Sequence, residues 1–194
     1  MAGIKDAPVE EYASLYGDDA DEFQRLMAHR PPLMDALSAF QLTLRTERVL
    51  PDRLLELVRL RIAFWNQCRS CMAGRYQEGI DDGVTEGLVC SLERPQDAED
   101  LTPAERAAIA YADLMATDHL AIADDTFEGL REHFTEPEIV ELAVNVAYGV
   151  GIGRFTATLH MVEGLPDRFR TGERVTPWGD GEVVVLSAVE ADAR

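Results

Sequence analysis

The chain has 194 residues, of which 46% are hydrophobic, and it carries a formal net charge of -18 at pH 7 with an isoelectric point near 4.5. This length suits one ordinary domain with a sizeable core. An electrostatic field of this sign repels phosphate backbones and anionic lipid, so we expect neither a nucleic acid nor a membrane as a partner. Lys5 is the only lysine, which argues against Schiff-base or P-loop chemistry in the folded body.

The hydrophobic pattern predicts an all-α fold in three parts. Residues 1–20 are polar and weakly patterned, so we interpret them as an N-terminal arm. Residues 21–170 are predicted to form a helical domain, and residues 171–194 a C-terminal tail. No signal peptide or membrane span is visible, and three cysteines are too few for a secreted disulfide framework, so we expect a cytoplasmic protein.

Three helices are predicted before the first cysteine. A short helix over residues 18–29 is stopped by Pro31 and Pro32, and a second covers residues 33–46. The third, over residues 51–66, is apolar on nearly all sides, which is typical of a buried central helix.

The pattern after Cys68 and Cys71 is again helical. We expect one helix to run from the cysteines to about Glu78, followed by a polar loop over residues 94–100. Thr102 and Thr135 begin capping-box signatures, each with glutamate three residues later. The further predicted helices cover residues 84–92, 102–115, 124–134, 135–148 and 154–162.

Two other features bear on architecture. Gly149, Gly151 and Gly153 interrupt the last helical pattern, and we expect them to permit either close helix packing or a kink. The segment 54–58 (LLELV) resembles the segment 139–143 (IVELA), which suggests an internal duplication. A short β-like run at 183–186 cannot satisfy its own backbone, so it either pairs with another subunit or is loose.

The segment Cys68-Arg-Ser-Cys71 is the strongest functional signal. Two thiols at this spacing allow one sulfur to attack a substrate and the other to close a disulfide with it. We expect Cys71 in the first turn of a helix, where the helix dipole favours a thiolate. Arg75 lies four residues later, so it is predicted one turn away on the same face, with its charge stabilising the thiolate.

Glu56 is the candidate acid–base group. If it is buried on an apolar helix, desolvation raises its pKa toward the range useful for proton transfer. It could instead pair with Arg59 or Arg75 and stay ionised. Both readings remain open from the sequence. Two other interpretations of the cysteines are open. They could be ordinary buried thiols that pack as small hydrophobic residues. They could also be zinc ligands, but this is less favoured because the sequence shows no set of four ligands.

The stretch Glu56-Leu-Val-Arg-Leu-Arg-Ile-Ala-Phe-Trp-Asn-Gln-Cys68-Arg-Ser-Cys71-Met-Ala-Gly-Arg75 resembles the carboxymuconolactone decarboxylase superfamily, on its alkylhydroperoxidase AhpD-like branch. The resemblance is strongest from about residue 51 to 83 and weaker from 101 to 164. It implies an all-helical homo-oligomer, commonly a trimer or hexamer. It also implies that Cys71 attacks a hydroperoxide, that Cys68 resolves the product and that Glu56 heads a proton relay. A thiol reductant or a redox partner protein would complete the cycle, with no cofactor and no metal.

The sequence departs from that pattern at two relay positions. The family usually has histidine four residues after the second cysteine, where this chain has Arg75, and often histidine or tyrosine just before it, where this chain has Ser70. Arginine cannot shuttle protons at neutral pH, so we expect slower or altered peroxidase chemistry.

Two other functions are carried as alternatives. A decarboxylase-like lyase acting on a small acidic substrate would need a cationic pocket, and four arginines could supply it: Arg59, Arg61, Arg75 and Arg154. A non-catalytic redox-sensing oligomer would need only the thiol pair.

Overall fold

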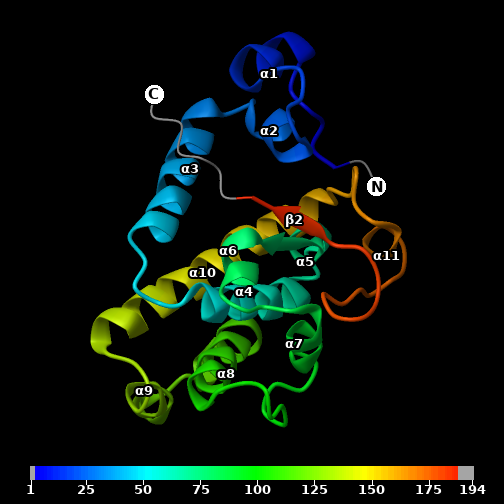
Figure 1. Ribbon diagram of the computed structural model, residues 1–194. Coiled ribbons are helices and arrows are strands. Elements are labelled where there is room, and N and C mark those ends of the chain that lie inside the picture. The colour runs from blue at the N-terminus through cyan, green and yellow to red at the C-terminus, as the bar shows by residue number, and fades with distance from the viewer. Residues whose placement is uncertain (1–2, 188–194) are drawn as a thin grey trace.

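The computed structural model describes residues 3–187, which form a mostly helical fold (Figure 1). Its elements, in chain order, are α1 (Val9–Tyr16), α2 (Glu22–Met27), α3 (Pro31–Thr46), α4 (Asp52–Asn66), α5 (Arg69–Ala73), β1 (Gly74–Tyr76), α6 (Gln77–Asp81), α7 (Glu86–Ser91), α8 (Pro103–Thr117), the single-turn η1 (His119–Ala121), α9 (Asp124–Arg131), α10 (Glu136–Leu159), α11 (Asp167–Arg170) and β2 (Val184–Leu186).

Helix α4 is the centre of the fold, as its all-round apolar pattern predicts. It packs between α8 and α10, and Leu57 and Leu60 on α4 are fully buried. Ala112 on α8 and Leu142 on α10 are buried to the same degree. Because α8 and α10 both pack against α4, the side chains on the remaining face of α4 have a fixed backbone position.

The capping signatures mark true helix starts. The Thr102 hydroxyl accepts a hydrogen bond from the backbone N–H of Glu105, whose carboxylate accepts one from the N–H of Thr102. At α10 the Glu138 carboxylate accepts from both the N–H and the hydroxyl of Thr135. These contacts satisfy N–H groups that a helix start would otherwise leave unpaired.

The expected interruption of the last long helix is wrong. Helix α10 runs unbroken for 24 residues through all three glycines. A Cβ on Gly149 would lie 3.3 Å from Cδ1 of Ile62, and one on Gly153 would lie 2.5 Å from Nδ2 of Asn66. Gly149 and Gly153 therefore let α10 approach α4 closely, which was one of the two roles expected of the glycines.

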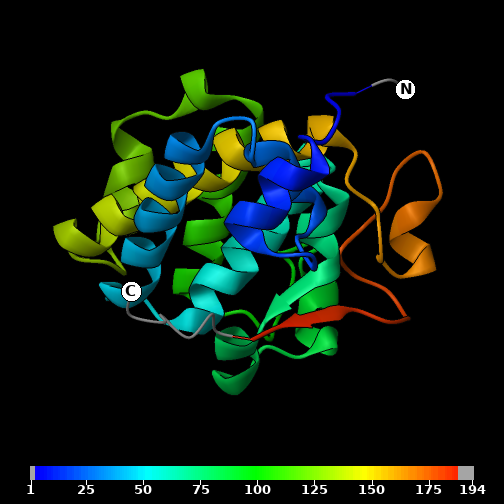
Figure 2. The ribbon, with the colours of Figure 1, turned by 90° about the horizontal axis from the view of Figure 1, so that it is seen from above.

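The segment after the cysteines also differs from its prediction. Helix α5 ends at Ala73, and the next three residues form strand β1 before α6 begins. Strand β2 from the C-terminal tail pairs with β1 in parallel, with Gly74 opposite Val184 and Tyr76 opposite Leu186 (Figure 2). The tail strand therefore finds its partner within its own chain.

The N-terminal segment, which was predicted to be a weakly patterned arm, contains helix α1. Neither α1 nor α3 has a buried residue, and Figure 1 shows these helices to one side of the body formed by α4, α8 and α10. Within residues 3–187, no helix combines the length and hydropathy that crossing a membrane requires. The domain boundaries and the internal duplication remain predictions, and the end of the tail, residues 188–194, lies outside the described chain.

Candidate active site

Cys68 and Cys71 are joined by a disulfide with an S–S distance of 2.12 Å. The Cys68 sulfur also caps α5, because it accepts a hydrogen bond from the backbone N–H of Cys71 at 3.4 Å. Cys68 is fully buried, whereas Cys71 is half-buried and lines a cavity. The two sulfurs thus differ in access, and only Cys71 faces the cavity.

Glu56 projects from the remaining face of α4, where it is 3% exposed. Arg59, one turn later, grips its carboxylate with two hydrogen bonds of 2.7 Å, and the backbone N–H of Tyr76 donates a third at 3.1 Å. Of the two arginines expected as partners of Glu56, the structure selects Arg59. Three donors therefore fix the position of this carboxylate.

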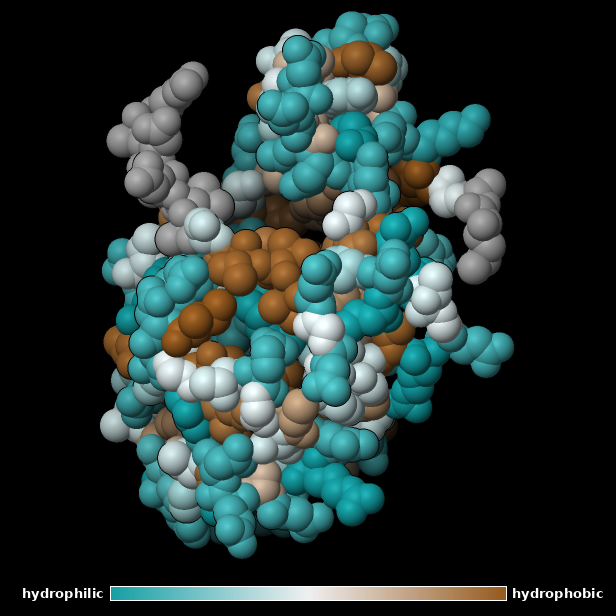
Figure 3. Space-filling model, turned by 45° about the vertical axis from the view of Figure 1, so that its right-hand side comes forward, coloured by the Kyte–Doolittle hydropathy of each residue, from teal (hydrophilic) through white to brown (hydrophobic). Residues whose placement is uncertain are grey.

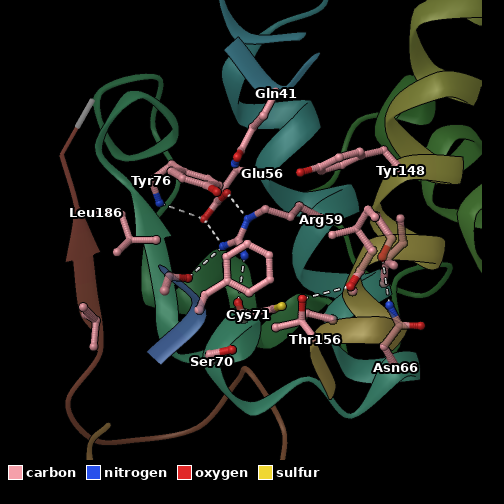
Figure 4. Close-up of a pocket in the computed structure, with 18 of the residues that line it drawn as sticks. Gln41, Glu56, Arg59, Asn66, Ser70, Cys71, Tyr76, Tyr148, Thr156 and Leu186 are labelled. Carbon is pink, nitrogen blue, oxygen red and sulfur yellow. Dashed lines mark hydrogen bonds and ion pairs between the residues drawn. The ribbon is translucent and has the colours of Figure 1, made fainter. Parts of the chain in front are cut away.

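Arg59 links this ion pair to the cysteine segment. Its guanidinium donates to the carbonyl of Cys71 and to the carbonyl of Gly74, both at 2.7 Å, and lies over the ring of Tyr76 (Figure 4). Burial by itself lowers the pKa of Arg59, but the charge and hydrogen bonds of Glu56 outweigh it, so the pKa is raised. A permanent positive charge therefore lies at the backbone of the cavity-facing cysteine.

The expectation that Arg75 shares a helical face with Cys71 is wrong, because α5 ends at Ala73 and Arg75 lies in β1. Its side chain is 1% exposed and does not line the cavity. It pairs with Glu86 at 2.8 Å and donates to three carbonyls, those of Met72, Gly74 and Pro177. Arg75 thus ties the C-terminal tail to the cysteine segment.

The cavity itself has a volume of about 610 Å³ and lies between the N-terminal helices and the body of the fold. Figure 3 shows a hollow beneath the N-terminal helices with apolar residues on its walls. Helices α3, α4 and α10 supply most of the wall, and Val184 and Leu186 of β2 close one side. Ser70 lines it as well, beside Cys71.

The arginines considered for an acidic substrate do not converge on this cavity. Arg61 pairs with Asp113 at 2.7 Å, and Arg154 donates to the side-chain oxygen of Asn66 at 3.1 Å. Only Arg59 of that set lines the cavity, and its charge is taken up by Glu56. The cationic pocket that the lyase alternative requires is therefore not formed by these residues.

Several site residues carried no recognisable signal in the sequence. Gln41 of α3, Tyr148 of α10 and Leu186 of β2 line the cavity, yet they lie far from the cysteines along the chain. The β-like pattern of the tail was the only hint, and it did not indicate the partner strand. Among residues 3–187, no group of three or more His, Cys, Asp or Glu side chains is arranged to hold a metal ion.

Known proteins resemble this chain in sequence and in fold. Residues 31–114 match the model of the carboxymuconolactone decarboxylase family. The resemblance drawn from the cysteine segment is confirmed. The matched range contains α3, α4, the cysteines and most of α8, so the family pattern covers the wall that carries Glu56, Arg59 and the disulfide.

Two uncharacterized proteins of Mycobacterium tuberculosis, from strains CDC 1551 / Oshkosh and ATCC 25618 / H37Rv, are each 34% identical to the chain over 91 residues. This stretch is 47% of the chain and 32% of each relative, so the chain spans about a third of the length of these curated relatives.

Two solved structures share the fold. The AhpD core of an uncharacterized peroxidase-related protein from Ralstonia eutropha JMP134 superposes with a TM-score of 0.65 at 22% identity, over 88% of this chain and 96% of that one. A protein of unknown function from Agrobacterium tumefaciens, for which an AhpD antioxidant defence role has been suggested, gives 0.63 at 22% identity, over 72% and 96%. At this identity the likeness establishes an AhpD-like helical fold.

Proposed function

We propose that the protein is a thiol-dependent peroxidase of the alkylhydroperoxidase type, which reduces hydroperoxides through Cys71 and Cys68. One observation carries the proposal: the two cysteines form a disulfide in which Cys71 faces an apolar cavity while Cys68 is fully buried. A substrate in the cavity meets one sulfur, and the other is placed to trap the oxidised product.

The chemistry follows in three steps. The Cys71 thiolate attacks the outer oxygen of the hydroperoxide, so that an S–O bond forms, the O–O bond breaks and the alkoxide takes a proton from water. The resulting sulfenic acid condenses with the Cys68 thiol, which releases water and closes the disulfide. A dithiol, small or protein-borne, then reduces the disulfide by thiol–disulfide exchange and is itself oxidised.

The charged groups position the cysteine segment rather than relay protons. Arg59 donates to the carbonyls of Cys71 and Gly74, so it fixes the backbone of the attacking residue. Glu56 holds the Arg59 guanidinium in place through two hydrogen bonds, so we assign it the part of a positioning residue instead of the head of a proton relay. Arg75 acts through the fold, by fixing the tail that closes the cavity.

The test uses reduced protein and an organic hydroperoxide, with peroxide loss and free thiols measured together. The wild type should consume peroxide and form the Cys68–Cys71 disulfide. Cys71→Ser should consume none, whereas Cys68→Ser should react once and leave a sulfenic acid that a dione reagent traps at Cys71. Cys90→Ser is the matched control, because Cys90 is a free, exposed cysteine on α7.

Two results would remove the proposal. Peroxide turnover that survives Cys71→Ser places the chemistry elsewhere. If the thiol pair is oxidised and reduced in equilibrium with a redox buffer but never consumes peroxide, the redox-sensing alternative is supported instead. The lyase alternative has less support, because the arginines that it would need are paired or lie away from the cavity.

Homo-oligomerisation, as a trimer or hexamer, is part of the proposal. Helix α3 buries no residue, and an isolated helix of 16 residues is marginal in water. Phe40 on α3 and Val140 and Val144 on α10 are exposed, Val140 at 61%. Light scattering should report an assembly that Val140→Glu with Val144→Glu dissociates, while Leu120→Glu, on the exposed η1 turn, leaves it intact.

A further inference from the structure

Every arginine that faces the cavity is paired with a carboxylate that faces the same cavity. The four pairs are Arg25 with Glu163, Arg45 with Glu78, Arg48 with Asp52 and Arg59 with Glu56. Two further lining carboxylates, Asp21 and Glu22, accept hydrogen bonds from backbone N–H groups. Among the described residues the wall therefore offers no unpaired cation, and an anionic ligand would be desolvated there without compensation.

The hydroxyl of Tyr76 and two further polar side chains on the wall have no hydrogen-bond partner among the described residues. The two further groups are the amide of Gln41 and the hydroxyl of Tyr148, and both line the cavity. Figure 4 shows the two groups directed into the same part of the cavity, with Arg59 between them and the Cys71 sulfur. Burial, together with the nearby Tyr76, raises the pKa of Tyr148 to about 12, so its hydroxyl remains a donor at neutral pH.

The rest of the wall is mainly apolar. The volume of about 610 Å³ falls within the roughly 300–1,000 Å³ range of small-molecule sites. The apolar side chains facing it include Leu37, Leu44, Leu55, Ile62 and Ile152. A wall of this kind, with a few convergent polar groups, is typical of a site that buries an organic molecule and fixes its orientation.

We propose that the cavity binds an uncharged organic molecule with a large apolar body and a carbonyl or hydroxyl group, which Gln41 and Tyr148 hold at the end away from Cys71. This deepens the proposed function, on which it rests for the identity of the reacting group. The substrate class becomes neutral organic hydroperoxides that carry a second oxygen group remote from the peroxide. Hydroperoxides with a free carboxylate are disfavoured.

The test measures binding to the disulfide form, so that it does not depend on turnover. The probes are cumyl alcohol, which is the product of cumene hydroperoxide, and its para-acetyl, para-carboxylate and para-ammoniomethyl derivatives. The acetyl derivative should bind at least about tenfold more tightly than either charged one. Tyr148→Phe and Gln41→Leu should each weaken the acetyl derivative about fivefold, the value of one neutral hydrogen bond, and leave unsubstituted cumyl alcohol unchanged.

Matched controls separate a lost hydrogen bond from a disturbed fold. Tyr111→Phe on α8 and Gln77→Leu on α6 make the same chemical changes at residues that do not line the cavity, so they should leave all four affinities unchanged. Tightest binding of a charged derivative overturns the inference. Failure of every probe to bind the folded protein also overturns it, because the cavity would then not accept an uncharged organic molecule of this size. Peroxide turnover is a separate readout, and its loss with intact acetyl selectivity would remove the proposed function alone.

Discussion

Gly79 lies directly against Glu56, and a side chain at that glycine would occupy the place where the glutamate leaves α4. A Cβ on Gly79 would come within 2.8 Å of Cβ and 2.9 Å of Cγ of Glu56. These atoms are the base of the Glu56 side chain rather than its mobile end, so they cannot swing aside. The buried position of the Glu56–Arg59 pair therefore requires a residue without a side chain at position 79 of α6.

Gly79→Ala should destabilise the protein by about 1–3 kcal/mol, because the added methyl forces α6 away from α4. Urea unfolding at neutral pH measures the difference. Gly129→Ala is the control, since Gly129 lies within helix α9 and an added Cβ would meet nothing within 4 Å. There the same change should be neutral or stabilising by up to about 1 kcal/mol. Equal effects at the two positions would show that the contact with Glu56 is unimportant.

Glu56→Gln should cost about 3 kcal/mol, because it leaves the Arg59 guanidinium with only carbonyl partners in a site that is largely closed to water. Glu136→Gln makes the same change in the exposed pair of Glu136 with Arg131, where less than about 1 kcal/mol is expected. Denaturant unfolding of both variants under one buffer gives the comparison. A loss at Glu56 no larger than that at Glu136 would contradict the role assigned to the buried pair.

The sequence was sufficient to predict the elements whose signals are local. The periodicity of α4, the capping boxes of α8 and α10 and the spacing of Cys68 and Cys71 each depend on residues within one or two turns, and each is found in the structure. The AhpD-like helical fold that the resemblance implied is also found, in the likeness to two solved structures. Local rules work here because they describe hydrogen bonds and packing between near neighbours.

The parts that the sequence did not predict depend on distant contacts. Arg75 was assigned to the helix of Cys71, but the chain leaves the helix because β2, more than a hundred residues later, supplies a strand partner to β1. Tyr148 of α10 and Gln41 of α3 line the same cavity only once both helices have reached their places in the fold. A hydrophobic pattern does not predict that the Arg75 guanidinium donates to the carbonyl of Pro177 in the tail. Contacts of this kind are found only in the folded structure.

Glu105 should make the stability of the protein fall in mild acid. Burial alone raises its pKa, but hydrogen bonds from Arg53 and from the N–H of Thr102 outweigh burial, so its pKa is lowered from the usual 4.5. A carboxyl with a lowered folded-state pKa contributes stability that is complete well above pH 4.5 and is lost as the pH falls through the folded value.

Glu105→Gln should therefore be less stable than the wild type at pH 7, and the difference should shrink steadily below about pH 5. The free energy of unfolding, measured from pH 7 to pH 3, checks both the sign and the window. Glu99→Gln is the control, because Glu99 is exposed and makes no ion pair with the described residues. A gap between Glu105→Gln and the wild type that widens in acid would contradict the assignment.

Arg75→His, which places the residue usual in the family four positions after the second cysteine, should not improve peroxide turnover. Histidine is too short to replace the contacts of Arg75 with Glu86 and with the carbonyls of Met72 and Pro177, all of which lie away from the cavity. We expect a loss of about 3 kcal/mol in unfolding free energy and faster proteolysis of the segment 172–187, with turnover equal to or below that of the wild type. Arg131→His, at an exposed surface pair, should leave the unfolding free energy, the proteolysis of the tail and the turnover nearly unchanged. A gain in turnover by Arg75→His with an intact tail would mean that the histidine reaches Cys71 after all, and that Arg75 belongs to the site rather than to the anchor of the tail.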